Sequence, residues 1–264
     1  MKIYCSYNHE YHIFLNKVVK LVLNQYGSDL NISTLKEIEL RDIDEFEIET
    51  DGRTFGNDKI KVTSRLYDLL PTLDIECLNE NNDYKLLRKT IYHEMGHIND
   101  MAYMPNLYKC VFENIQKKAA NINISTASLF WLEYKAEKRS SGFENVYDLE
   151  ICDDFVDSEW MCSMSSFTED FNDNNFCYLT KILPYFLART TSGDIRQRYL
   201  AKIKNNVLLD YIGELDNELK SLETKGIFDD LDILNNLFGI IKKYENIFIN
   251  IFSALQVENI KYFI

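Results

Sequence analysis

Residues 90–100 read Thr-Ile-Tyr-His-Glu-Met-Gly-His-Ile-Asn-Asp, with two histidines that flank a short segment beginning with glutamate. His93 and His97 are four residues apart, so a helix places both imidazoles on one face, one turn apart. Two imidazole nitrogens at this spacing can bind one zinc ion at about 2.0–2.1 Å each. Glu94 follows the first histidine, where it can accept a proton from a metal-activated water and pass it to a leaving amine.

The residues around this motif are those of a buried helix. Met95, Gly96 and Ile98 carry no charge, and apolar residues upstream recur at helical spacing. Asn82 or Asp83 can cap the helix, which is expected to end before position 105, a proline. The chain has only 4 His in 264 residues, so a chance match is rare. The competing interpretation is a coincidental pair of surface histidines.

A third metal ligand has to come from elsewhere in the chain. No histidine follows position 97. A longer zinc motif would need Gly at 100 and His at 103, but the chain has Asp100 and Tyr103 there. A carboxylate is therefore the expected third ligand. The candidates are Glu133 and Glu137, four residues apart on one predicted helix face, with Asp100 as a further choice.

The pattern resembles the gluzincin metallopeptidases, the thermolysin-like clan in which two His and one Glu bind zinc. It looks like the small intracellular members, including those that cut repressor proteins. The resemblance runs from Thr90 to Ser140. It implies a zincin-like fold, a Zn²⁺ cofactor and a protein or peptide substrate. The implied reaction is hydrolysis of a peptide bond by metal-activated water, with Glu94 as the general base.

The resemblance also implies roles for the two acids of the downstream helix. Glu133 corresponds to the glutamate ligand, and Glu137 to an acid four residues later that orients a ligating histidine. The family usually has Asp at the latter place, so Glu137 is a departure. Asn99 is another, because this position is usually apolar. Glu137 as the ligand in place of Glu133 stays open, since helical phase does not separate residues one turn apart.

Peptide hydrolysis also needs a donor that stabilises the oxyanion of the transition state. Tyr103 and Tyr134 are the candidates of first choice, with Tyr108 and the more distant Arg189 behind them. The chain has 17 Tyr, and the sequence does not choose among them.

Hydrophobic periodicity predicts an α+β protein with a small N-terminal sheet and a helical C-terminal half. A zincin-like metallopeptidase domain is expected over residues 1–145 and a helical domain over 146–264. Asp51-Gly52 and Gly56-Asn57 supply turn chemistry between the strands. The expected elements are a helix at 10–26, strands at 35–40, 46–50 and 59–63, a short helix at 65–70, a helix from 125 or 126 to 142, and four or five helices beyond 146.

The strand at 59–63 is also the candidate for substrate binding. In a fold of this kind, the edge strand before the motif helix can hold a peptide as an added strand. The alternative is an ordinary sheet strand with solvated lysines.

Composition limits the other partners. The net charge of -13 disfavours binding to nucleic acid through a basic face. No apolar stretch reaches the roughly 18 residues that a membrane span needs. The N-terminus has no secretory signal pattern, and six scattered cysteines form no CxxC pair, which is typical of reduced thiols in a cytoplasmic protein. The oligomeric state is left open.

Two other classes of function fit the same residues. The chain could be a catalytically silent zinc-binding regulatory or partner-binding protein on the same fold, with four protein ligands closing the metal site. It could also be a metal-free helical interaction module in which the motif is a coincidence.

Overall fold

The computed structural model of the chain describes residues 1–6, 9–41, 52–63, 82–116, 122–141, 173–191, 193–203 and 206–261. The chain forms two compact units. The first comprises Met1–Tyr103 with Lys138–Val146, and the second comprises Met104–Glu137 with Tyr147–Ile264. Residues 104–137, expected in the first domain, therefore cluster with the C-terminal helices. The domain boundary expected at residue 145 lies outside the described residues.

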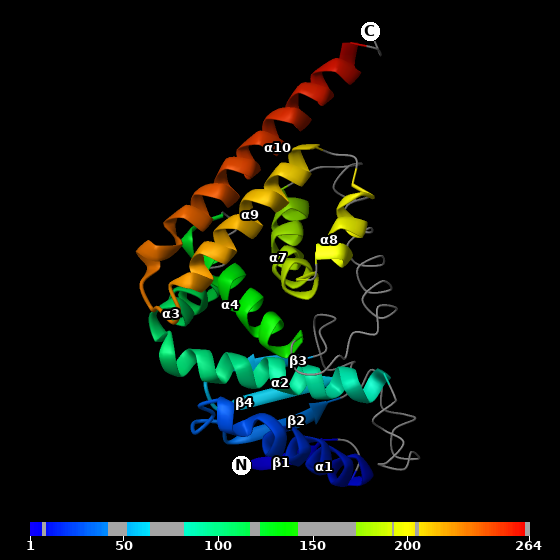
Figure 1. Ribbon diagram of the computed structural model, residues 1–264, viewed down its shortest axis with the longest axis vertical. Helices are drawn as coiled ribbons and strands as arrows, with labels where there is room; N and C mark the ends of the chain where they lie inside the picture. The colour runs from blue at the N-terminus through cyan, green and yellow to red at the C-terminus, as the bar shows by residue number, and fades with distance from the viewer. Residues whose placement is uncertain are drawn as a thin grey trace. The chain divides into compact units, whose positions relative to one another are not determined.

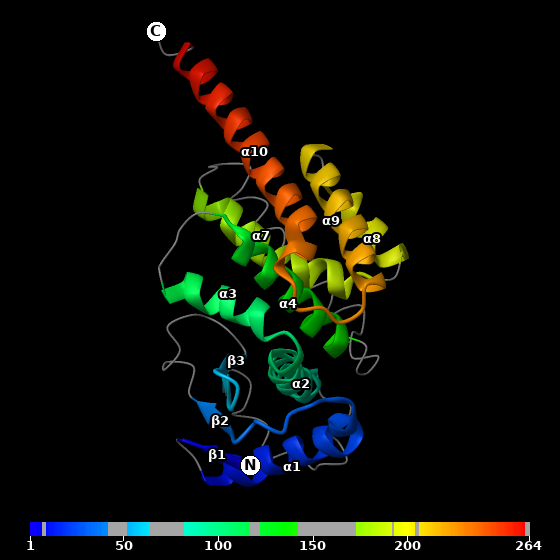
Figure 2. The same cartoon turned by 90° about the vertical axis from the view of Figure 1, so that its left-hand side faces the viewer.

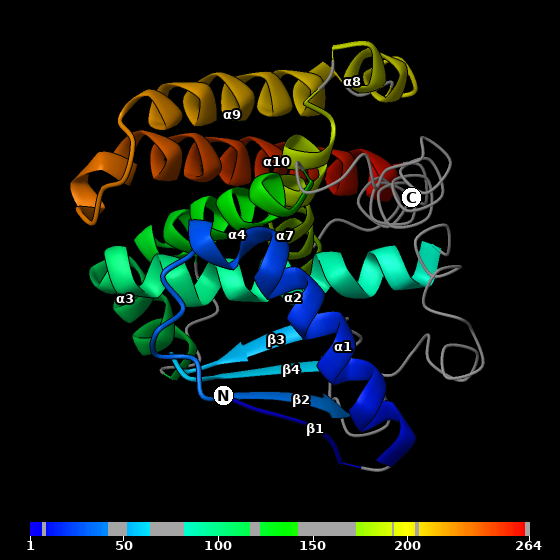
Figure 3. The ribbon, with the colours of Figure 1, turned by 60° about the horizontal axis from the view of Figure 1, so that its bottom comes forward.

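The first unit contains a four-stranded sheet in the order β1-β2-β4-β3 (Figure 3). β1 and β4 are both parallel to β2, and β3 runs antiparallel to β4. The strands are Lys2–Cys5 (β1), Glu37–Arg41 (β2), Gly52–Phe55 (β3) and Lys59–Thr63 (β4).

The sheet has one apolar face and one charged face, because side chains alternate along each strand. Ile38 and Leu40 of β2, with Ile60 and Val62 of β4, are fully buried on the apolar face. On the opposite face, Lys59 pairs with Glu37 and Glu39 of the neighbouring strand. These ion pairs hold the pKa of Lys59 above its usual value, although burial acts in the opposite direction.

Two helices pack on the apolar face. They are α1 (His9–Tyr26), continued by a short 3-10 helix at Gly27–Asp29, and α2 (Asn82–Tyr103). Figure 2 views α2 along its axis, beside β3. Helically spaced apolar side chains from both join the sheet residues in one core. The central contributors are Leu15, Val18, Val19 and Val22 from α1 and Leu87, Ile91, Met95 and Ile98 from α2.

The second unit is helical within the described ranges, and Figure 1 shows α9 (Asn206–Thr224) and α10 (Asn235–Lys261) side by side. An aromatic core joins them, with the ring centroids of Tyr211 and Tyr244 4.7 Å apart. Helix α4 (Ile124–Ser141) is shared between the units. Its residues up to Glu137 belong to the second unit, and its last turn, from Lys138, belongs to the first. The elements are α3 (Pro105–Gln116), α4 (Ile124–Ser141), α7 (Asp173–Arg189), α8 (Gly193–Leu200), α9 (Asn206–Thr224), a 3-10 helix at Leu231–Leu234 and α10 (Asn235–Lys261). No helix in the described ranges is long and apolar enough to cross a membrane.

The expected α+β class, the helix over 10–26, the strand over 59–63 and the motif helix are confirmed. β1 and β3 were not predicted from the sequence, and Gly52, expected in a turn, begins β3. The assignment of residues 59–63 to a substrate-binding edge is wrong, because β4 is paired on both sides, by β2 and β3. The expected strand at 46–50 and helix at 65–70 lie outside the described residues.

The packing of the sheet against the two helices predicts a stability difference between buried and exposed isoleucines. Ile60→Ala removes a side chain that is 0% exposed and should lower the free energy of unfolding by about 2–5 kcal/mol. Ile13→Ala, at a position 52% exposed on α1, should change it by only about 0.5 kcal/mol. Urea denaturation of the two variants beside the unchanged protein measures both values. Equal destabilisation would contradict the described core.

Candidate metal centre

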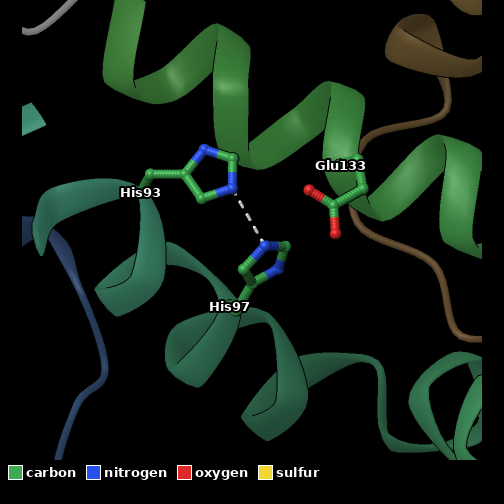
Figure 4. A group of neighbouring side chains, drawn as sticks. All are labelled: His93, His97 and Glu133. Atoms are coloured by element: carbon green, nitrogen blue, oxygen red, sulfur yellow. Dashed lines mark hydrogen bonds between the residues drawn. The ribbon is translucent and has the colours of Figure 1, made fainter. Parts of the chain in front are cut away.

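The two histidines of the motif lie on α2 with their rings directed toward each other (Figure 4). His93 is 7% exposed and His97 8%, and their Nε2 atoms are 3.1 Å apart. Between two neutral imidazoles, only a ring carrying its proton on Nε2 can donate across this contact. The two rings thus bring the same nitrogen, Nε2, to one region of the site.

Glu133, on α4, completes a group of three potential metal ligands with His93 and His97. One ligand atom from each residue lies within 4.8 Å of the others, and Figure 4 shows the carboxylate facing the two rings. Ligand atoms around a tetrahedral zinc at about 2.0–2.1 Å are about 3.3 Å apart. The two histidine nitrogens are near this spacing. Two histidines and a glutamate are a donor set of catalytic zinc sites that leaves the fourth position open.

Asp100, the further ligand candidate, has a different role in the structure. Its Oδ1 accepts hydrogen bonds from Arg139 Nη2 at 2.7 Å and from Asn99 Nδ2 at 2.9 Å. The Asp100 carboxylate is 2% exposed, so the guanidinium compensates a buried charge. This ion pair ties the last turn of α4 to α2 within the first unit.

The departure from the family pattern at Asn99 has a structural reason. The Asn99 side chain is 8% exposed, and both ends of its amide are engaged. Its nitrogen donates to Asp100, and its oxygen accepts the backbone N–H of Asn31 at 2.8 Å. An apolar residue here would leave the Asn31 N–H without this partner.

Glu137, predicted to orient a histidine ring or to bind the metal itself, is 1% exposed. Its Oε1 accepts a hydrogen bond from Arg189 Nε at 2.5 Å. The potential metal group contains Glu133 and not Glu137. Arg189, predicted as a distant oxyanion stabiliser, is thus placed beside an acid of α4. The ring-orienting role of Glu137 stays a prediction.

Tyr185 is a residue that the sequence analysis missed. Its hydroxyl donates to Glu133 Oε2 at 2.6 Å, and the guanidinium of Arg189 lies 5.7 Å from its ring centroid. Tyr185 and Arg189 are four residues apart on α7, as Glu133 and Glu137 are on α4. The only sequence signal for this contact was that the two donors on α7 and the two acids on α4 have the same four-residue spacing. Many residue pairs in a helical chain share this spacing, so the signal was not specific.

The two tyrosines predicted to stabilise the oxyanion have different surroundings. Tyr103 is 48% exposed at the end of α2. Tyr134 is 3% exposed, and its hydroxyl donates to Glu223 Oε1 at 2.8 Å. Burial, together with the hydrogen bond to Glu223, raises the pKa of Tyr134 above its usual value. Its proton is therefore directed toward an acid of α9, and the oxyanion role of both tyrosines stays a prediction.

Glu94, the predicted general base, is 6% exposed on α2. Its Oε2 accepts a hydrogen bond of 2.6 Å from the Thr54 hydroxyl of β3. Thr54 was not singled out from the sequence, because the strand that carries it was not recognised.

Comparison of the chain with protein-family models, with curated proteins and with solved structures gives no match.

The hydrogen bond from Tyr185 to Glu133 predicts an effect on metal affinity. Groups that hydrogen-bond a metal ligand orient it, and their loss weakens metal binding by about 10- to 100-fold. Tyr185→Phe should therefore raise the zinc dissociation constant by about 10-fold or more, measured by competition with a chromophoric chelator. Tyr103→Phe, which changes an exposed tyrosine, is the control and should leave the constant unchanged. An unaltered constant for Tyr185→Phe would contradict the role of this hydrogen bond.

Proposed function

We propose that the chain is a zinc-dependent metallopeptidase of the gluzincin type. The observation that carries this proposal is the group formed by His93, His97 and Glu133, with the buried Glu94 directly following the first histidine. The order of the first unit, in which a helix and a small sheet precede the motif helix, supports a zincin-like fold.

The proposed reaction divides the work among four side chains. His93, His97 and Glu133 would hold the metal, the histidines through a ring nitrogen and the glutamate through a carboxylate oxygen. Bound zinc supplies Lewis acidity that polarises the scissile carbonyl and makes an attacking water more acidic. Glu94 accepts the proton of the attacking water and delivers it to the leaving amine, so that one carboxylate acts first as base and then as acid.

The surroundings of the other acids support an open, catalytic site over a closed, structural one. A catalytically silent zinc protein would need a fourth protein ligand. Asp100 and Glu137, the acids proposed to close the shell, each pair with an arginine, Arg139 and Arg189 respectively. A carboxylate that compensates a buried guanidinium is costly to remove from it.

A protein or peptide substrate would bind along an edge of the described sheet. β3 is an edge strand of the described sheet and lies next to α2, the helix that carries Glu94. An extended peptide can pair with the unpaired backbone groups of such a strand. The net charge of -13 is compatible with a basic or neutral polypeptide and unfavourable for nucleic acid. We propose a cytoplasmic location as part of the same assignment.

Metal content is the first test of the proposed function. Elemental analysis of protein purified without chelator should find about one zinc per chain, as expected for a single catalytic site. His97→Ala removes one ligand and should abolish this binding. His12→Ala, which changes a half-buried histidine of α1, is the matched control and should keep the metal. Protein that holds no zinc, and takes up none when zinc is added, would refute the metal site.

The role of Glu94 predicts a loss of turnover without a loss of metal. Glu94→Gln keeps the size of the side chain but cannot accept the proton of the attacking water. The rate of peptide-library cleavage should fall by about 10²–10⁴-fold or more, while the zinc content stays unchanged. Glu113→Gln, on α3, is the control for the same chemical change at a largely exposed site. Full activity of Glu94→Gln would rule out this mechanism.

A further inference from the structure

Strand β3 lies closer to α2 than a residue with a side chain at its first position would allow. A Cβ atom added to Gly52 would be 2.6 Å from Thr90 Cγ2 and 3.1 Å from both Cγ and Oε1 of Glu94. Separations below 3 Å force neighbouring atoms to move. The absence of a side chain at Gly52 therefore lets the strand backbone approach the helical turn that carries Glu94.

This close approach brings Thr54 into contact with Glu94. Side chains two residues apart on a strand point to the same face, so Thr54 faces α2, as Gly52 does. Its Oγ1 is 2.6 Å from Glu94 Oε2 and 3.3 Å from the backbone oxygen of Glu94. A hydroxyl has one hydrogen to donate, and the contact to the carboxylate is the shorter of the two.

The Thr54 hydroxyl contacts a carboxylate that is largely shielded from water. Glu94 is 6% exposed, and a buried carboxylate without hydrogen bonds is energetically costly. A glutamate side chain also has three rotatable bonds, so the helix backbone alone does not fix its oxygens. The Thr54 hydroxyl supplies both a hydrogen bond and a fixed direction for the carboxylate.

We infer that Gly52 and Thr54 form a clip on the edge strand that positions Glu94 for proton transfer. Gly52 sets the distance between strand and helix, and Thr54 holds the carboxylate, so Thr54 is a positioning residue. The inference rests on the proposed function, because it assigns a purpose to the placement of the general base. A general base must lie within hydrogen-bond reach of the proton that it takes, and small displacements lower the rate steeply.

The kinetic test compares three variants, all loaded with zinc. Thr54→Val keeps the branched shape and removes the hydroxyl, and kcat should fall by about 10-fold or more with little change in KM. Thr54→Ser restores the hydroxyl and should recover most of kcat. Thr224→Val makes the same change at an exposed position at the end of α9 and should leave both constants unchanged. Thr54→Ala replaces the valine variant if the latter does not fold.

A second readout does not depend on activity. The melting temperature of the metal-free protein is measured for Thr54→Val, Glu94→Ala and the double variant. If Thr54 and Glu94 interact, Thr54→Val should lower the melting temperature clearly in the original chain and much less when Glu94 is already absent. Additive shifts would overturn the proposed contact.

The outcomes separate this inference from the proposed function. Unchanged kcat in Thr54→Val, together with an inactive Glu94→Gln, would overturn the clip and leave the peptidase assignment standing. A raised KM with unchanged kcat would also overturn it, in favour of a contact with substrate. If the zinc-loaded original chain cleaves no peptide, the proposed function fails, and the catalytic purpose of the clip fails with it.

Discussion

The first unit depends on the burial of α2, the helix that carries the motif. Every residue from 91 to 100 is buried, although five of these ten are histidine, glutamate, asparagine or aspartate. A buried polar group without a partner costs more than a hydrogen bond contributes when it is formed, so such a helix is stable only if neighbouring elements supply partners. They do so here from three directions. β3 engages Glu94 through Thr54, the segment after α1 engages Asn99 through Asn31, and α4 engages Asp100 through Arg139.

This requirement explains why segments that are distant in the sequence contribute polar contacts to the motif helix. The apolar residues of α2 bring it to the sheet, but they do not fix its rotation or its height above the strands. The polar contacts do, because each has a narrow range of distance and direction. Gly52 has the same effect by steric means, since β3 could not reach the Glu94 turn with a larger residue in that place. A helix placed in this way presents His93 and His97 with fixed backbones, as a binding site requires.

Periodicity in the sequence was sufficient for the long elements and insufficient for the short ones. The apolar spacing of α1 and α2 extends over several turns, and the alternation in β4 is regular. These three elements were therefore predictable. β1 and β3 have four residues each, and β3 has a single apolar residue, Phe55, which points away from the core face. Glycine at its start suggested a turn, whereas its actual role depends on a helix that lies far along the chain. For the same reason the motif gave His93, Glu94 and His97, while Thr54 and Tyr185 could be found only from the fold.

The structure also gives a physical argument for Glu133 over Glu137 as the third ligand, a choice that helical phase left open. Both acids accept hydrogen bonds from α7, but their donors differ in charge. Arg189 is a cation, so its contact with Glu137 compensates the carboxylate charge in a site where that residue is 1% exposed. The hydroxyl of Tyr185 donates to Glu133 Oε2, and a hydrogen bond of this kind orients a carboxylate. A carboxylate that is paired with a guanidinium would first have to give up that partner to bind a metal, and Glu133, not Glu137, belongs to the group of potential ligands.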